Sequence, residues 1–90
     1  MNFSIYRAED DTTMKKVLCE MPLLIYFELV NSASDFTNIA YEHFEGFDYY
    51  DAESTNLRGD DVSFRVAFLS IEFARQGVDA LRNYFEENAR

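Results

Sequence analysis

The sequence predicts a small α+β domain over residues 1–90, and two kinds of pattern lead to this fold class. At residues 3–8 and 62–68, apolar and polar residues alternate as they do along a half-buried strand. In the middle of the chain and at its C-terminus, apolar residues recur three and four positions apart, as on one face of a helix. We therefore expect a short antiparallel or mixed sheet with about three helices. Because some segments fit both patterns, a mainly α-helical fold is the alternative.

The first third of the chain predicts a strand, a helix and a second strand. Residues 3–8 (FSIYRA) form the short first strand, and residues 9–21 (EDDTTMKKVLCEM) form a helix that Pro22 ends. The apolar face of this helix consists of Met14, Val17, Leu18 and Met21. Residues 23–30 (LLIYFELV) are apolar on both faces, which indicates a central strand covered on both sides. A buried helix that begins at Pro22 is the alternative.

The middle of the chain contains the clearest helix, within residues 31–46 (NSASDFTNIAYEHFEG). Ser32 or Ser34 can cap its N-terminus, and Gly46 supplies the left-handed residue that ends it. Its apolar face consists of Phe36, Ile39, Ala40 and Phe44. Residues 47–53 (FDYYDAE) then continue as a strand or as an irregular acidic segment.

The last part of the chain predicts a loop, a strand and a helix. Turn-forming residues around Gly59 indicate a loop over residues 54–61, and residues 62–68 alternate as a strand. The alternative is a helix over residues 60–77 with Gly77 as its stop. A strand is favoured over residues 62–68 and a helix becomes plausible after Ser70, so the type of residues 62–76 stays open. Residues 78–90 form an amphipathic helix with Val78, Leu81 and Phe85 on its inner face and an Arg82–Glu86 pair on its surface. The predicted order is βαβαββα.

The net charge of −9 limits the possible partners. Direct binding to nucleic acid or to an anionic membrane needs a positive surface, which this composition does not provide, whereas a negative field attracts basic proteins. The single cysteine, Cys19, cannot form an internal disulfide and suits a packed core position. With no visible secretion signal and no apolar run of about 20 residues, we expect a cytoplasmic protein, in the host cell if a phage encodes it.

The side chains that usually carry catalysis are scarce, so we expect no enzyme. The only histidine, His43, has no partner in a recognisable triad, and one cysteine with one histidine does not make a zinc site. Neither Asp48 nor Asp51 begins a calcium-binding loop, and the three glycines lie too far apart to cradle phosphate. We therefore expect no metal and no cofactor.

The acidity is concentrated in residues 42–61, which carry −6 of the total charge. Carboxylates that recur every third residue there have spacings that bracket the distance between neighbouring phosphates of a nucleic-acid strand. The tyrosines of this segment suit contact positions, because tyrosine pairs an apolar ring with a polar tip. The predicted partner-binding residues are Glu42, Glu45, Asp48, Tyr49, Tyr50, Asp51, Glu53, Asp60 and Asp61.

In size, charge and lack of catalytic residues, the chain resembles small acidic phage proteins that block CRISPR effectors, restriction enzymes or other DNA-binding machinery. This resemblance in composition implies an inhibitor that mimics the charge of DNA or RNA and docks on a basic, nucleic-acid-binding protein or nuclease. An immunity protein or antitoxin that neutralises a cationic nuclease is the first alternative. A structural module is the second, with LLIYFELV or the aromatic segment as a dimer seam; either a monomer or a homodimer is compatible with the sequence.

Overall fold

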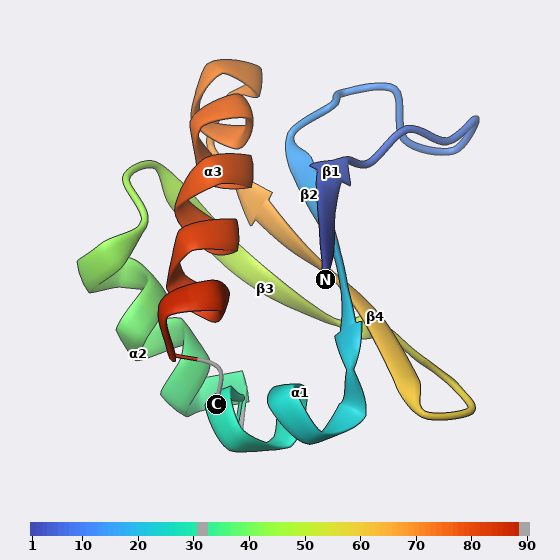
Figure 1. Cartoon of the computed structure of the whole chain (residues 1–90). Helices are drawn as coiled ribbons and strands as arrows, with labels where there is room; N and C mark the ends of the chain where they lie inside the picture. Colours follow the sequence, from blue (N-terminus) through green and yellow to red (C-terminus); the bar gives the residue numbers. More distant parts are fainter. Residues whose placement is uncertain (31–32, 89–90) are drawn as a thin grey trace.

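A four-stranded antiparallel sheet with three helices forms the protein, as the computed structural model shows for residues 1–30 and 33–88 (Figure 1). The elements are β1 (Asn2–Ile5), β2 (Lys16–Pro22), α1 (Leu23–Leu29), α2 (Ala33–His43), β3 (Phe47–Arg58), β4 (Asp61–Phe68) and α3 (Ile71–Asn88). The strand order is β1-β2-β4-β3, so that β2 and β4 are central and the long strand β3 is an edge. The α+β fold class predicted from the sequence is confirmed.

The core lies between the sheet and the helices, and phenylalanine dominates it. Alternate residues of the two central strands point to the helices and are buried: Val17, Cys19, Met21, Val62, Phe64, Val66 and Phe68. The rings of Phe36 on α2, Phe64 on β4 and Phe85 on α3 lie 6.2–6.3 Å apart, centre to centre. Aromatic pairs at such distances add to the free energy gained from burial, so these three elements are held in one arrangement.

The opposite face of the sheet carries mainly polar side chains. Lys16, Leu18 and Glu20 alternate with the buried residues of β2, and Ser63 and Arg65 do so on β4. None of these five side chains is fully buried. An antiparallel sheet that is covered on one face and solvated on the other shows this alternation.

The predicted helix over residues 9–21 is wrong, because its second half is strand β2. The spacing of four between Val17 and Met21 satisfies a helix, but Val17, Cys19 and Met21 also alternate as a strand requires. Hydrogen bonding to β1 on one side and to β4 on the other decides between the two patterns. These partners lie far away in the sequence, so the local pattern does not reveal them.

The predicted central strand over residues 23–30 is wrong as well, because residues 23–29 form helix α1. The alternative, a buried helix that begins at Pro22, is right about the helix but wrong about burial, because no residue of α1 is buried. Pairing between β2 and β4 ends at Pro22 and Asp61, and Pro22 holds the extended conformation that leads into the helix. The observed order is therefore ββααββα rather than βαβαββα.

The helix predicted within residues 31–46 is confirmed as α2, with Phe36, Ala40 and Phe44 buried and Ile39 partly exposed. Gly46 ends this region at a φ of 75°, as expected. Of the two residues expected to cap α2, Ser34 lies inside the helix. Ser32 lies outside the described residues.

The second half of the chain follows the predictions with three corrections. The strands at 47–53 and 62–68 and the helix after Ser70 are confirmed. The predicted loop over residues 54–61 is wrong, because β3 continues to Arg58 and only the turn at Gly59 and Asp60 remains. Gly77 does not stop a helix but lies buried inside α3. Arg82 pairs with Asp79, at 2.8 Å, and not with Glu86.

Candidate interaction surface

Three of the predicted carboxylates lie together where α2 turns into β3. Glu42 lies in the last turn of α2 and Glu45 in the turn that follows the helix, and Gly46 reverses the chain so that Asp48 follows at the start of β3. All three side chains are exposed. The hydroxyl of Tyr41 donates a hydrogen bond to the carbonyl oxygen of Asp48, at 3.3 Å, and so links the helix to the strand. We call these four residues the acidic corner.

Tyr41 belongs to the acidic corner, although it was not among the partner-binding residues predicted from the sequence. Its side chain is 64% exposed, and its ring meets Phe47 edge-on at 5.0 Å between centroids. A helical projection anchored on Phe36, Ala40 and Phe44 would have shown that position 41 lies about 100° from the centre of the buried face. The acidic corner thus combines three carboxylates with one rigid, exposed ring.

The two tyrosines that were predicted as contact residues differ in exposure. Tyr49 is 46% exposed, and its ring centroid lies 5.8 Å from the Lys16 ammonium. Tyr50, in contrast, belongs to the core, where its ring packs edge-on against Phe36 and Phe64. The prediction of Tyr50 as an exposed contact residue is therefore wrong, because the pleat of β3 turns it toward the helices.

The hydroxyl of Tyr50 has partners inside the fold. It shares hydrogen bonds with the hydroxyl of Tyr26, at 2.8 Å, and with that of Thr55, at 3.1 Å. Burial raises the pKa of Tyr50 and keeps its hydroxyl protonated. This short chain of hydroxyls joins α1 to the middle of β3, so it fixes the position of α1 on the sheet.

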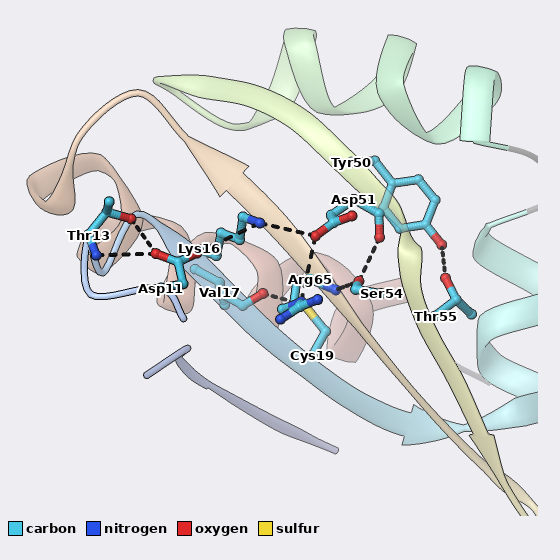
Figure 2. A network of polar contacts seen from close by, with 10 residues as sticks. All are labelled: Asp11, Thr13, Lys16, Val17, Cys19, Tyr50, Asp51, Ser54, Thr55 and Arg65. Atoms are coloured by element: carbon cyan, nitrogen blue, oxygen red, sulfur yellow. Dashed lines mark hydrogen bonds and ion pairs between the residues drawn. The ribbon is translucent and has the colours of Figure 1, made fainter. Parts of the chain in front are cut away.

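Asp51 lies at the centre of a polar network on the open face of the sheet, between two cations (Figure 2). Its Oδ2 atom accepts a hydrogen bond from Lys16 Nζ at 3.1 Å and lies 3.6 Å from Arg65 Nε. A second carboxylate, that of Asp11, lies 3.7 Å from Lys16 Nζ and accepts hydrogen bonds from Thr13. Two cations and two anions make this network neutral, so Asp51 is engaged within the fold.

The carboxylate of Asp51 changes the pKa of Lys16, and the ring of Tyr6 contacts the guanidinium of Arg65. Burial disfavours the Lys16 ammonium, but the hydrogen bond and charge of Asp51 outweigh it and raise the pKa of Lys16 above its ordinary value. The guanidinium of Arg65 stacks over the ring of Tyr6, with 4.3 Å between its carbon and the ring centroid.

The last three predicted carboxylates lie farther along β3. Glu53 is exposed in the middle of the strand, and Asp60 and Asp61 are exposed at the turn into β4. This turn and the acidic corner lie at opposite ends of β3 (Figure 1). Phe47 and Arg58 at the two ends of β3 pair with Phe68 and Asp61 at the two ends of the eight-residue strand β4. At about 3.3 Å per residue, the two ends of β3 are therefore roughly 23 Å apart. The predicted site is therefore a row along one edge of the sheet and not a single cluster.

Six carboxylates along this edge are free of salt bridges with any residue that the structure describes. They are Glu42, Glu45, Asp48, Glu53, Asp60 and Asp61, which we call the acidic edge. Within the described ranges, the structure holds no group of three or more His, Cys, Asp or Glu side chains arranged to bind a metal ion. No helix formed by the described residues is long and apolar enough to cross a membrane.

Comparisons with known proteins give no match. No family model fits the sequence, no curated protein is significantly similar in sequence, and no solved structure is significantly similar in fold.

Proposed function

We propose that the protein binds a basic, nucleic-acid-binding protein through its acidic edge and blocks the site where that protein holds DNA or RNA. The observation that carries this proposal is the row of six exposed carboxylates that runs from the end of α2 along β3 to the β3–β4 turn, none of them in a salt bridge with a described residue. A groove lined by Lys and Arg for phosphates would accept such a row. The proposed partners, CRISPR effectors and restriction enzymes of the host, act on intracellular nucleic acid, so the proposal implies a cytoplasmic protein.

The spacing of the acidic edge supports mimicry of a nucleic-acid strand. Six charges over roughly 23 Å amount to about one charge per 4 Å, and one DNA strand carries a charge per about 3.4 Å of helix axis. The fold holds the backbone of this row in place before binding, so only the carboxylate side chains need to be ordered when a partner binds. The cations Lys16 and Arg65 are neutralised by the Asp51 network and leave the edge negative.

Displacement of nucleic acid from purified partners tests the proposal. A CRISPR effector nuclease, a restriction endonuclease and a cationic toxin nuclease are each bound to fluorescently labelled nucleic acid, and the anisotropy is followed as the protein is added. We expect displacement from at least one of them, with an affinity that falls steeply between about 50 and 200 mM salt. Displacement from the toxin nuclease alone would identify an immunity protein instead.

Two charge-reversed variants separate a local contact from the general field. In one, Glu42, Glu45 and Asp48 are replaced by Lys; in the other, Glu72, Glu86 and Glu87 on α3 are replaced by Lys. All six residues are exposed, and both variants change the net charge equally. We expect the first to weaken displacement at least about tenfold and the second by less than about threefold. Equal effects, or no displacement from any of the three nucleases, would contradict the proposal.

A further inference from the structure

Helix α1 has an unusual composition for its position on the surface. Six of its seven residues are apolar or aromatic, and Glu28 alone is charged, yet none of the seven is buried. Leu24 is 78% exposed and Phe27 is 58% exposed. On a surface helix, polar side chains normally occupy the outward positions. The outward face of α1 instead presents a leucine and a phenylalanine to solvent.

The fold uses only the inner face of α1. Tyr26 packs against Phe64, with 5.4 Å between ring centroids, and its hydroxyl meets that of Tyr50. Leu23, Ile25 and Leu29 are partly buried against the core. Phe27 meets the ring of Tyr26 edge-on, with 5.9 Å between centroids, but neither Phe27 nor Leu24 packs against the core. Large exposed apolar side chains of this kind lower solubility and contribute little to the free energy of folding.

Carboxylates lie at both ends of this exposed face of α1. The backbone N–H of Leu23 donates to the carbonyl oxygen of Asp60 at 2.8 Å, which fixes the start of α1 against the β3–β4 turn. Asp60 and Asp61 therefore lie beside the start of α1, where Leu24 follows Leu23, and Glu28 follows Phe27 directly. We call Leu24 and Phe27, with the carboxylates Glu28, Asp60 and Asp61, the α1 knob. Its carboxylates at the β3–β4 turn are also the far end of the acidic edge.

We propose that the α1 knob is the apolar anchor by which this protein docks on its basic partner, in an apolar pocket flanked by Lys and Arg side chains. The inference rests on the proposed function, because it names the apolar part of the same interface. Interfaces commonly place a few large apolar side chains at the centre and charged groups at the rim. The carboxylates at the rim select a pocket of opposite charge.

Charge also argues against a second copy of this chain as the occupant. In a twofold contact, the same surface of both subunits meets. Such a contact through α1 would bring Glu28, Asp60 and Asp61 of one copy close to the same carboxylates of the other. Like charges that face each other oppose association. The α1 knob is therefore better suited to bind a basic partner than to bind a second copy of this protein.

A designed peptide pair tests the proposal directly. The probe is a labelled helical peptide with leucines along one face and lysines along both flanks; the control peptide has serines in place of the leucines. We expect the leucine peptide to bind at least about tenfold more tightly than the serine peptide. In NMR spectra of the labelled protein, the leucine peptide should shift the signals of residues 23–29 and 60–61.

Variants of the protein locate the binding site of the peptide. Leu24→Ser and Phe27→Ser, made separately, should each weaken binding of the leucine peptide several-fold, and together about tenfold or more. Leu69→Ser is the matched control, because Leu69 is 58% exposed but lies next to Gly46, near the acidic corner. It should leave the affinity unchanged. Replacing Asp60 and Asp61 by Lys, which leaves α1 itself intact, should also weaken binding.

Three outcomes would overturn the docking proposal. They are equal affinities for the two peptides, unchanged binding by the Leu24→Ser/Phe27→Ser protein, and a dimer in light scattering that these substitutions dissolve. The nucleic-acid displacement assay separates this failure from that of the proposed function. If the double variant still displaces nucleic acid as the wild type does, the docking proposal fails and the proposed function stands. If the peptide results hold but no nucleic acid is displaced, the proposed function fails.

Discussion

At the scale of single residues, Asp48 and Asp51 have different environments, although both were predicted from the sequence to bind a partner. Asp48 is exposed and joins the acidic corner, whereas Asp51 bridges Lys16 and Arg65. The register pairs Asp51 with Arg65 on the open face of the sheet. Arg65 Nε is enclosed, and it makes no hydrogen bond within the described part of the chain, so Asp51 supplies its compensating charge. A carboxylate in this position stabilises the fold more than it serves a partner.

Asp51→Asn should therefore destabilise the protein, by about 1–3 kcal/mol, because partly buried Arg65 loses its counter-charge and Lys16 is left with the more distant Asp11. Asp48→Asn is the matched control and should change the free energy of unfolding by less than about 0.5 kcal/mol. Urea denaturation at pH 7 measures both. Equal effects of the two substitutions would contradict a structural role for Asp51.

The same network has a defined dependence on pH. Because folding raises the pKa of Lys16, its stabilising contribution is complete below the ordinary lysine value of 10.5 and is lost as the pH rises through the folded value. Hydrogen bonds from Thr13 lower the pKa of Asp11, so its contribution is present above the ordinary value of 3.8 and is lost as the pH falls through the folded value.

At the scale of elements, close contact between α3 and β4 explains a glycine in the middle of a helix. A Cβ atom at Gly77 would lie 2.3 Å from the ring of Phe68. Glycine in a helix interior costs about 1 kcal/mol relative to alanine. The glycine lets the helix approach the sheet closely enough for Leu81 and Phe85 to be buried.

Gly77→Ala should lower the free energy of unfolding by about 1–3 kcal/mol, since the clash with Phe68 outweighs the gain in helix propensity. The adjacent Gln76→Ala is the control, because position 76 is exposed and should tolerate alanine without loss. Thermal unfolding followed by circular dichroism compares them. A Gly77→Ala protein more stable than the wild type would show that α3 can move away from the sheet at no cost.

Strand β3 shows how an exposed edge can carry a charged surface. Its register against β4 shifts between Phe47 and Tyr49 and again between Asp51 and Asn56. Such irregularities make an edge a poor template for further strand pairing. Exposed carboxylates at Asp48 and Glu53 act in the same direction. We therefore expect side chains, and not backbone pairing, to make the contacts of this edge.

At the scale of the whole molecule, charge is distributed unevenly. The cations Lys16, Arg65 and Arg82 are each engaged by a carboxylate, whereas the acidic edge has no such partners in residues 1–30 and 33–88. Self-repulsion at a net charge of −9 opposes the compact state. Such repulsion favours partner binding, because a basic partner relieves it.

Added salt should therefore stabilise the free protein. Between about 10 and 200 mM NaCl at pH 7, screening should raise its stability by about 1 kcal/mol and its melting temperature by roughly 4–8 °C. The variant with Lys at positions 42, 45 and 48 has less repulsion and should respond less to salt. Differential scanning calorimetry measures both proteins, and a melting temperature that falls with salt would refute this view of the charge balance.

The sequence alone determined the fold class, the helix at α2, the strand at 62–68, the C-terminal helix and the concentration of acid in residues 42–61. These features depend on local composition and on patterns that favour one element type; residues 62–68 also fit a helix, but their regular alternation favours a strand. Val17 to Met21 fit both helix and strand, and residues 23–29 are apolar on all sides, so local pattern could not assign β2 or α1. Pairing with β1 and β4 makes residues 16–22 a strand, and the end of this pairing at Pro22 is where α1 begins.

Contacts between distant segments determine which of the acidic and aromatic residues face solvent, so the sequence pattern could not predict their exposure. Within β3, the pleat and the register buried Tyr50, engaged Asp51 and left Asp48 and Tyr49 exposed. The length of β3 separated Asp60 and Asp61 from the acidic corner and placed them beside α1. Sequence fixes how much charge and how many rings a chain has, but accessibility depends on contacts between segments far apart in the chain. For this reason the sequence predicted an acidic partner-binding segment, and the structure divided it into a row of charges and an apolar knob.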